Sequence, residues 1–324
     1  MDSKDKKIHP QPADNGDIKR VRVSPEGRVM IKKSDLKALK ESLPKKTEIG
    51  GKTVFDNKAD NKDYGKKVLS GDASDTSSDS GRIGEYLEEK VPSIEVPLAA
   101  EDITALKTYA VMLREKNKVM NLTNITDDEG IAVRHFVDSL TIVTYIKAEQ
   151  EKNGNKALSV IDVGTGAGFP GIPLKIALKD IKLTLLDSLA KRIGFLDEVI
   201  AAIGLKNVKT VHSRAEDAGH DKNYRGKYDI SVARAVAPLP VLCEYCLPFV
   251  RKGGAFIAMK GHLEEELEAS ETAISKLGGT IEKIEKFTLP GTDMERSVVI
   301  IRKKADTPSS YPRKAGTPSK NPIK

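Results

Sequence analysis

The stretch DVGTGAGFPG, residues 162–171, decides how the rest of this chain is interpreted. It follows the apolar run LSVIDV from Leu158 and precedes LKIALK, so its glycines fall at a turn from a strand to a helix. Glycine at such a turn permits positive backbone φ and lets a ligand approach amides that a Cβ would block. We therefore expect a cofactor to lie over this turn.

Two glycine patterns fit the turn. Gly166, Gly168 and Gly171 match the dinucleotide pattern, whereas Gly164, Gly166 and Gly168 match the alternating glycines of methyltransferases. The glycines alone do not decide between a nicotinamide dinucleotide and S-adenosylmethionine.

Two carboxylates near the turn favour S-adenosylmethionine. Asp162 precedes the glycines, where a dinucleotide enzyme usually continues with an apolar residue, and a carboxylate there can hold a cationic amino-acid end. Asp187 ends the next apolar run, KLTLLD, and can accept both ribose hydroxyls of either cofactor. The alternative interpretation makes Asp162 a cap of the following turn and Asp187 a cap of the helix at Leu189.

Short β-branched runs alternate with amphipathic stretches around this turn. The runs begin at Leu158, Lys182, Val208, Tyr228 and Gly254. This rhythm predicts an α/β fold with a doubly wound, Rossmann-like sheet. Two final runs, one from Thr280 and SVVIIRK from Ser297, have no helical pattern between them and predict an antiparallel end of the sheet.

Composition and pattern divide the chain into four parts. We expect a mostly disordered polar extension over residues 1–81, a helical region over 82–150 packed on the next part, a catalytic domain over 151–304 and a basic tail over 305–324. Within the extension, alternating apolar residues around Pro25-Glu26-Gly27 predict a small hairpin.

The composition also limits the environment of the protein. No apolar run approaches the roughly 18 residues of a membrane span, and the first residues are charged where a secretory signal is apolar. The two cysteines, Cys243 and Cys246, form no disulfide framework, and a lone CxxC is weak evidence for zinc. We therefore expect a cytosolic protein with no membrane contact and no metal, and the sequence indicates no obligate protein partner.

Positive charge is concentrated at the end of the chain. The formal net charge is +7, and residues 302–324 hold seven basic side chains and one acidic one. This distribution favours nucleic acid or another acidic partner, and the alternative is a solubilising tail.

Several blocks together resemble the GidB/RsmG family of bacterial small-subunit ribosomal RNA methyltransferases. They are NLTNIT from Asn121, RHFVDSL from Arg134, DVGTGAGFPG, LLDSLAKRIGFL from Leu185, SRAE from Ser213, SVARAVAPL from Ser231 and YPRKAGTPSKNP from Tyr311. The resemblance implies a class I methyltransferase fold that uses S-adenosylmethionine. It also implies methylation of N7 of one guanine in the decoding-centre loop, with small-subunit RNA or the small ribosomal subunit as partner.

The resemblance also assigns cofactor contacts. They fall on Gly164, Phe169, Ala215, Glu216 and Arg234. The Ala215 backbone and Glu216 sit where the adenine edge is expected, and Phe169 can cover an apolar part of the ligand. Arg234 can face the cofactor, an RNA phosphate or the target base, or it can pair with a carboxylate such as Glu216.

The chemistry of N7 sets what else the site needs. The N7 lone pair is already nucleophilic, so methyl transfer needs alignment of the reactants rather than a general base. In this sequence ARAVAP replaces the tetrapeptide that amine methyltransferases place after the fourth strand. The candidate RNA contacts are basic: Arg134 and His135, and in the tail Arg313, Lys314 and Lys320. His135 can instead be a packed neutral histidine. The tail prolines and glycine are expected to prevent regular structure.

Three other functions remain open from the sequence. A small-molecule methyltransferase would share the cofactor site, a non-catalytic RNA-binding or assembly factor would share the fold, and a nicotinamide oxidoreductase would share the glycine turn.

Overall fold

The computed structural model describes residues 22–23, 29–30, 81–261 and 263–324, and the chain divides into two compact units, 1–54 and 55–324. In the first unit β1 (Arg22–Val23) pairs antiparallel with β2 (Val29–Met30), which confirms the predicted hairpin. The disorder predicted for the rest of residues 1–80 concerns residues outside those described.

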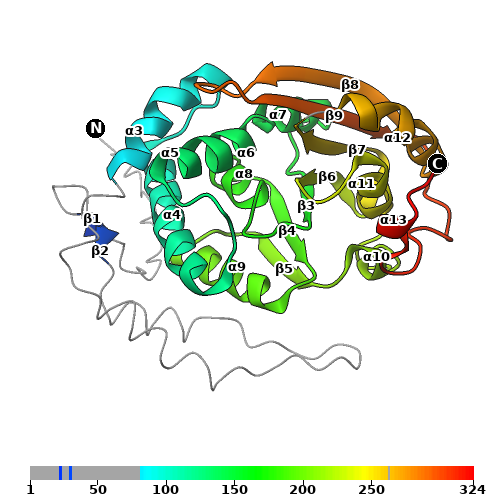
Figure 1. Ribbon diagram of the computed structural model, residues 1–324, viewed down its shortest axis with the longest axis horizontal. Coiled ribbons are helices and arrows are strands. Elements are labelled where there is room, and N and C mark those ends of the chain that lie inside the picture. The colour runs from blue at the N-terminus through cyan, green and yellow to red at the C-terminus, as the bar shows by residue number, and fades with distance from the viewer. Residues whose placement is uncertain (1–21, 24–28, 31–80, 262) are drawn as a thin grey trace, which may run out of the picture. The chain divides into compact units, whose positions relative to one another are not determined.

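Within the described part of the second unit, a seven-stranded sheet organises the chain (Figure 1). Its strands are β3 (Ser159–Val163), β4 (Lys182–Asp187), β5 (Val208–His212), β6 (Tyr228–Arg234), β7 (Val250–Lys260), β8 (Gly279–Thr288) and β9 (Glu295–Lys303). They lie in the order β5-β4-β3-β6-β7-β9-β8, with β5 to β7 parallel and β9 antiparallel to both its neighbours. The predicted doubly wound sheet with an antiparallel last strand is confirmed.

The order of strands reverses at β3. β4 and β5 extend the sheet on one side of β3, whereas β6 returns to its other side. Open α/β sheets bind ligands at the carboxyl ends of the strands where such a reversal occurs. The glycine turn leaves the carboxyl end of β3, and Arg234 is the last residue of β6, so both border this position.

Helices cover both faces of the sheet, with an apolar cluster under each layer (Figure 1). α8 (Gly171–Ala177) and α9 (Ala190–Ile203) contribute to the first cluster, and α11 (Leu239–Cys246) and α12 (Glu264–Lys276) to the second. Because the central strands are buried on both faces, their sequences are nearly continuous apolar runs.

The region predicted to be helical forms further helices that share the first cluster. They are α3 (Gly81–Lys90), η1 (Val91–Ile94), α4 (Ala100–Met120), α5 (Asp128–Gly130), η2 (Ile131–Val137), α6 (Asp138–Leu140) and α7 (Val143–Lys152). Leu106, Tyr109, Ala110 and Leu113 are fully buried along one face of α4. Among the residues described, no helix combines the length and the apolar character that crossing a membrane requires.

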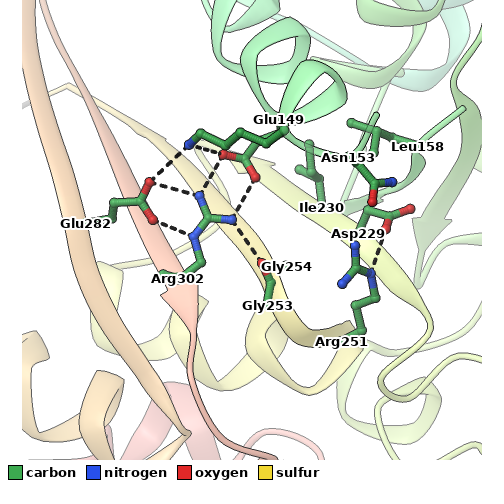
Figure 2. Close-up of a pocket in the computed structure, with 11 residues that line it drawn as sticks. Glu149, Asn153, Leu158, Asp229, Ile230, Arg251, Gly253, Gly254, Glu282 and Arg302 are labelled. Atoms are coloured by element: carbon green, nitrogen blue, oxygen red, sulfur yellow. Dashed lines mark hydrogen bonds and ion pairs between the residues drawn. The ribbon is translucent and has the colours of Figure 1, made fainter. Parts of the chain in front are cut away.

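A pocket of about 320 Å³ lies at the amino ends of the strands and is lined mainly by charged side chains (Figure 2). Arg302 donates to Glu149 at 2.6 and 2.7 Å and to Glu282 at 2.9 Å. Asp229 accepts a hydrogen bond from Arg251 Nε at 2.7 Å and also binds Ser159. These paired charges join α7 to β8 and β9, and they join β6 to β7.

The C-terminal segment, residues 305–324, packs on the second apolar cluster, where Ile323 is buried. It contains a short helix, α13 (Thr317–Lys320). The prediction that prolines prevent regular structure here is wrong at this point. Pro318 lies in the first turn of α13, where a helix needs no N–H donor.

Candidate functional site

The glycine turn needs glycine for two different reasons. Gly164, Gly166 and Gly168 have φ of 71°, 61° and 110°, which side chains rarely adopt. A Cβ on Gly168 would lie 2.6 Å from the Tyr109 hydroxyl oxygen, whereas a Cβ on Gly166 would meet nothing within 4 Å. Gly168 therefore serves packing against α4, and Gly166 leaves open space above the turn.

Asp162 lies fully buried beneath the turn. Its Oδ2 accepts hydrogen bonds from Thr165 Oγ1 at 2.6 Å and from the Gly171 N–H at 2.8 Å. Its Oδ1 is buried and has no hydrogen-bond partner among the described residues. Burial raises the pKa of Asp162 to about 6, although the two hydrogen bonds and the nearby Arg234 act in the opposite direction. Asp162 thus braces the turn, as its alternative interpretation expected, and keeps one oxygen free.

Asp187 ties the turn to the next strand. One oxygen accepts from the Leu189 N–H at 2.9 Å, which is the cap that the alternative interpretation predicted. The other accepts from the Gly166 N–H at 2.9 Å and from Arg192 Nη1 at 3.3 Å. Contact of this carboxylate with a ribose stays a prediction.

Phe169 faces the helical region rather than open space. Its ring is 7% exposed and stacks on the His135 ring, with centroids 4.4 Å apart, and on the Tyr109 ring at 5.3 Å. His135 Nε2 lies 2.8 Å from Thr123 Oγ1, and burial lowers the His135 pKa to about 3. His135 is therefore a packed neutral histidine that braces the cofactor turn, while its contact with RNA stays a prediction.

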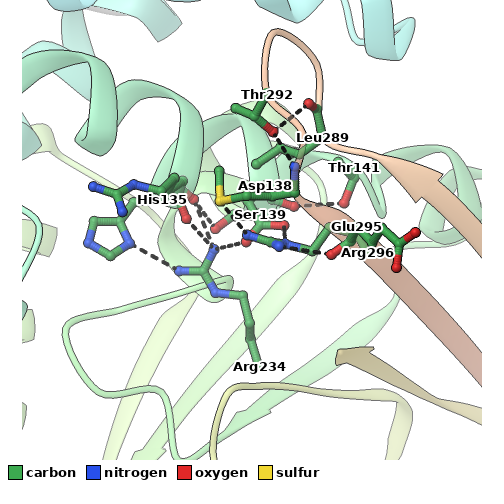
Figure 3. Close-up of polar contacts among 11 residues, drawn as sticks. His135, Asp138, Ser139, Thr141, Arg234, Leu289, Thr292, Glu295 and Arg296 are labelled. Atoms are coloured by element: carbon green, nitrogen blue, oxygen red, sulfur yellow. Dashed lines mark hydrogen bonds and ion pairs between the residues drawn. The ribbon is translucent and has the colours of Figure 1, made fainter. Parts of the chain in front are cut away.

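Arg234 is bound by a widened helical turn (Figure 3). η2 is a π-helix, and the Asp138 N–H donates to the carbonyl oxygens of Val133 and His135 rather than to that of Arg134. Arg234 Nη1 donates to the carbonyl oxygens of Arg134 and His135, at 3.2 Å each, and the His135 oxygen also accepts from Ser139 Oγ. Its guanidinium carbon lies 5.1 Å from the centroid of the Phe169 ring. Such widened turns are frequent at functional sites, and this one fixes the end of β6 against the glycine turn.

Asp138 joins Arg234 to a second arginine that the sequence did not reveal. Its Oδ2 lies 3.2 Å from Arg234 Nη1, and its Oδ1 lies 3.0 Å from Arg296 Nε on β9 (Figure 3). One alternative for Arg234 was an ion pair with a carboxylate such as Glu216; Arg234 does pair with a carboxylate, but that carboxylate is Asp138. The only sequence signal for Arg296 is a charged residue at the start of an otherwise apolar strand.

The predicted adenine contacts lie on α10 (Ala215–Ala218), directly after β5. Ala215 is half-buried and Glu216 is buried. Glu216 Oε1 accepts a hydrogen bond from the Gly316 N–H at 2.9 Å. The carboxylate that is predicted to contact adenine therefore also accepts a hydrogen bond from the C-terminal segment.

The predicted RNA contacts differ in whether their charged groups are paired within the protein or exposed to solvent. Arg313 donates from Nη2 to Glu244 Oε2 at 2.6 Å and from Nε at 2.9 and 3.1 Å, so its guanidinium anchors the segment instead of facing solvent. Lys314 and Lys320 are exposed. Arg134 has 41% of its side chain exposed, with Asp127 3.7 Å away.

The cysteines take no part in this site. Cys243 and Cys246 are fully buried in the second apolar cluster, and burial raises the pKa of both thiols. Over the described ranges, no group of three or more His, Cys, Asp or Glu residues is arranged to hold a metal ion.

Comparison with known proteins identifies the family. The GidB model, described as rRNA small subunit methyltransferase G, matches residues 102–298. The chain belongs to the GidB family. Its sheet has the strand order of a class I methyltransferase, as the resemblance implied.

Relatives of the GidB family align over most of the chain. Ribosomal RNA small subunit methyltransferase G of Acetivibrio thermocellus is 53% identical over 242 residues, which cover 75% of this chain and 97% of that protein. The protein of the same name from Alkaliphilus metalliredigens is 51% identical over 225 residues, covering 68% and 91%. A solved methyltransferase from Pyrococcus furiosus has a TM-score of 0.38 and 18% identity, covering 50% of this chain and 83% of that one.

Proposed function

We propose that this GidB-family chain methylates N7 of a guanine in the decoding-centre loop of small-subunit ribosomal RNA, using S-adenosylmethionine. The observation that carries the proposal is Asp162, whose Oδ1 is buried at the carboxyl end of β3 and has no hydrogen-bond partner in the part of the chain that the structure describes. An unpaired buried carboxylate oxygen favours a cationic ligand. A nicotinamide dinucleotide would instead place its anionic pyrophosphate near this carboxylate.

The residues present fit S-adenosylmethionine. Asp162 would hold the cationic amino-acid end, Asp187 the ribose hydroxyls, and Ala215 with Glu216 the adenine. Gly164 and Gly166 adopt left-handed φ; a Cβ on Gly166 would point into open space, whereas one on Gly164 would lie 3.0 Å from the Val236 side chain. When bound, S-adenosylmethionine supplies a sulfonium methyl group that a lone pair can attack.

The chain's own contribution is alignment. N7 of guanine carries no proton, so no base is required, and neutral buried His135 with a pKa of about 3 is a poor acid and a poor base at neutral pH. The buried Cys243 and Cys246 cannot serve as the nucleophile that cytosine C5 methylation requires. Holding two reactants in line lowers a barrier by about 7–11 kcal/mol. Arg234, fixed by the π-turn and by Asp138, is the residue best placed to orient the base or its phosphate.

The RNA side of the site is cationic. Arg134, Lys314 and Lys320 are exposed in the described structure and can contact phosphates, whereas Arg313 is occupied by Glu244. We infer that ribosomal RNA, alone or in the small subunit, binds across these residues.

Labelled methyl transfer tests the proposal. The protein is incubated with methyl-labelled S-adenosylmethionine and unmodified small-subunit RNA or particles, and the label is mapped by chain cleavage at N7-methylguanine. We expect one labelled guanine. Label in a small molecule would instead indicate a metabolite methyltransferase, and binding of RNA with no transfer would indicate an assembly factor. Either result would overturn the proposal.

A further inference from the structure

The C-terminal segment packs against α10, the short helix that carries the predicted adenine contacts. α13 lies beside α10 and α11 in Figure 1. The His220 ring, just after α10, lies 2.6 Å from the Pro312 carbonyl oxygen. Arg225 spans the same junction, with Nη1 bonded to the carbonyl oxygens of Gly219 and Tyr311 at 2.8 Å each. The C-terminal segment is thus hydrogen-bonded to both ends of the turn that follows α10, at His220 and at Arg225.

The strongest fastening is an ion pair on α11. Glu244 is fully buried, and Arg313 approaches it through its backbone N–H at 2.7 Å as well as through its guanidinium. Charge-assisted bonds of this forked kind are the strong ones in proteins. Because a buried carboxylate is costly without its partner, Glu244 favours the docked state of the segment.

A second fastening reaches the predicted adenine position itself. Glu216 is 5% exposed, and the Gly316 N–H donates to its Oε1 at 2.9 Å. Gly316 has φ of 82°, so the direction of this N–H depends on a backbone conformation that glycine favours. The second Glu216 oxygen has no protein hydrogen bond in the described part of the chain.

The chain just before α10 also contacts the turn at Asp187. The Ser213 N–H donates to the Asp187 carbonyl oxygen at 3.1 Å, and His212 Nε2 lies 3.1 Å from the Ser188 carbonyl oxygen. The two chain segments that carry the predicted ribose and adenine contacts are therefore hydrogen-bonded to each other, while the C-terminal segment contacts Glu216 itself.

We propose that the C-terminal segment is a positioning element of the cofactor site, with Gly316 orienting Glu216 for the adenine amine. This inference rests on the proposed use of S-adenosylmethionine. Docking of the segment and binding of the cofactor then stabilise each other, since coupling between two binding events is reciprocal. Because exposed Lys314 and Lys320 lie on the same segment, RNA that contacts them strengthens cofactor binding.

The test releases the segment without leaving a buried charge behind. In the double variant Glu244→Met, Arg313→Met, both partners become apolar, a replacement that folded proteins often tolerate. We expect calorimetry to give a Kd for S-adenosylmethionine at least about fivefold higher than that of the unchanged chain. Amide hydrogen exchange over residues 307–323 reports directly whether the segment has been released.

A milder variant and a matched control complete the test. Gly316→Ala meets no atom within 4 Å and only strains the backbone, so we expect a Kd about two- to threefold higher in a chain that still folds. The control Lys314→Ala, Lys320→Ala leaves the fastenings intact, and it should weaken RNA binding without changing the cofactor Kd measured in the absence of RNA.

The outcomes separate this inference from the function on which it rests. If hydrogen exchange shows that the segment of the double variant is released but the cofactor Kd stays within twofold of normal, the inference alone is overturned. If the double variant keeps its segment docked, an unchanged cofactor Kd for Gly316→Ala overturns the inference instead. Failure of the unchanged chain to bind S-adenosylmethionine would overturn the proposed function as well.

Discussion

The two ends of the sheet use the same kinds of charged residues in opposite ways. At the amino ends, Arg302 lies between Glu149 and Glu282, and every charge in this trio is paired (Figure 2). At the carboxyl ends, one carboxylate, Asp138, lies between two arginines, and Asp162 keeps a buried oxygen without a partner among the described residues (Figure 3). The saturated end stabilises the fold, and the unsaturated end retains binding capacity.

Backbone conformation follows the same division. Ala235, directly after Arg234, has φ of 54°, and the glycine turn has three left-handed residues in a row of five. Such strain persists where surrounding structure holds it, and it gathers at functional sites. The pocket at the amino ends lies away from the glycine turn and from the site that we propose.

The largest effect should come from Arg234. In Arg234→Ala the Arg134 carbonyl loses the Arg234 donor, but the His135 carbonyl keeps Ser139 Oγ and Asp138 keeps Arg296, so the chain should still fold. We expect the rate of methyl transfer to fall by about a hundredfold or more, because loss of alignment alone costs that much. Arg234→Lys should not restore the rate, since an ammonium group cannot reproduce the fork. A near-normal rate in folded Arg234→Ala would remove this residue from the site.

Arg302→Met tests the opposite end. The substitution leaves Lys152 as the cation beside Glu149 and Glu282, and the hydrogen bond from Arg302 is the main cause that lowers the Glu282 pKa to about 2. We expect the free energy of unfolding, measured in urea, to fall by about 3 kcal/mol, with unchanged kcat for the folded fraction. Glu282→Gln is the control, with a loss below about 1 kcal/mol because Glu282 is partly exposed. If Arg302→Met lost activity but kept its free energy of unfolding, the assignment of stability to the amino ends and of binding to the carboxyl ends would be contradicted.

A pair of glycine substitutions sharpens the comparison inside the turn. Gly168→Ala should lower the free energy of unfolding by about 2–3 kcal/mol, since its Cβ would collide with Tyr109 and its φ is left-handed. Gly166→Ala, where space is open, should cost about 1–2 kcal/mol of backbone strain and act mainly on cofactor affinity. Thermal unfolding together with calorimetry checks both, and equal stability losses would contradict the packing argument.

The smallest predicted effect is a pH dependence. Because burial raises the Asp162 pKa from 3.8 to about 6, the free folded protein favours the protonated form, and it loses stability as pH rises from about 4 to about 6. A cationic ligand favours the ionised form, so its affinity should rise with pH, by about tenfold between pH 5 and pH 7. His135 stays neutral over this range.

Asp162→Asn provides the control for this pH dependence. The amide cannot ionise, so the cofactor Kd measured by calorimetry should be higher and nearly constant from pH 5 to pH 7. A slope that survives the substitution would mean that another group holds the cationic end.

What the sequence predicted correctly depends on local pattern. The strands, the glycine turn and the Asp187 cap at Leu189 are set by residues a few positions apart, so composition and spacing reveal them. His135 was also recognised as a possible packed neutral histidine, because a lone histidine within an apolar helical stretch is usually buried.

What the sequence did not predict depends on contacts between distant segments. Asp138 and Arg296 are separated by 158 residues, Glu216 and Gly316 by 100, and Glu244 and Arg313 by 69. The basic tail suggested a free chain because charge and proline content say nothing about a buried carboxylate on another helix. The π-turn was hidden because all residues of η2 except Arg134 are buried, so the apolar pattern shows no single face whose phase an inserted residue would shift.

The position of β9 between β7 and β8 has a consequence for how the protein is made. β8 is synthesised first but pairs only with β9, and the outer edge of β7 also waits for that strand. During translation, a nascent chain that ends before Lys303 therefore exposes two unpaired strand edges, which favour aggregation. The segment that contacts Glu216 follows β9 in the chain, so a chain that still lacks β9 also lacks the Gly316 contact with Glu216.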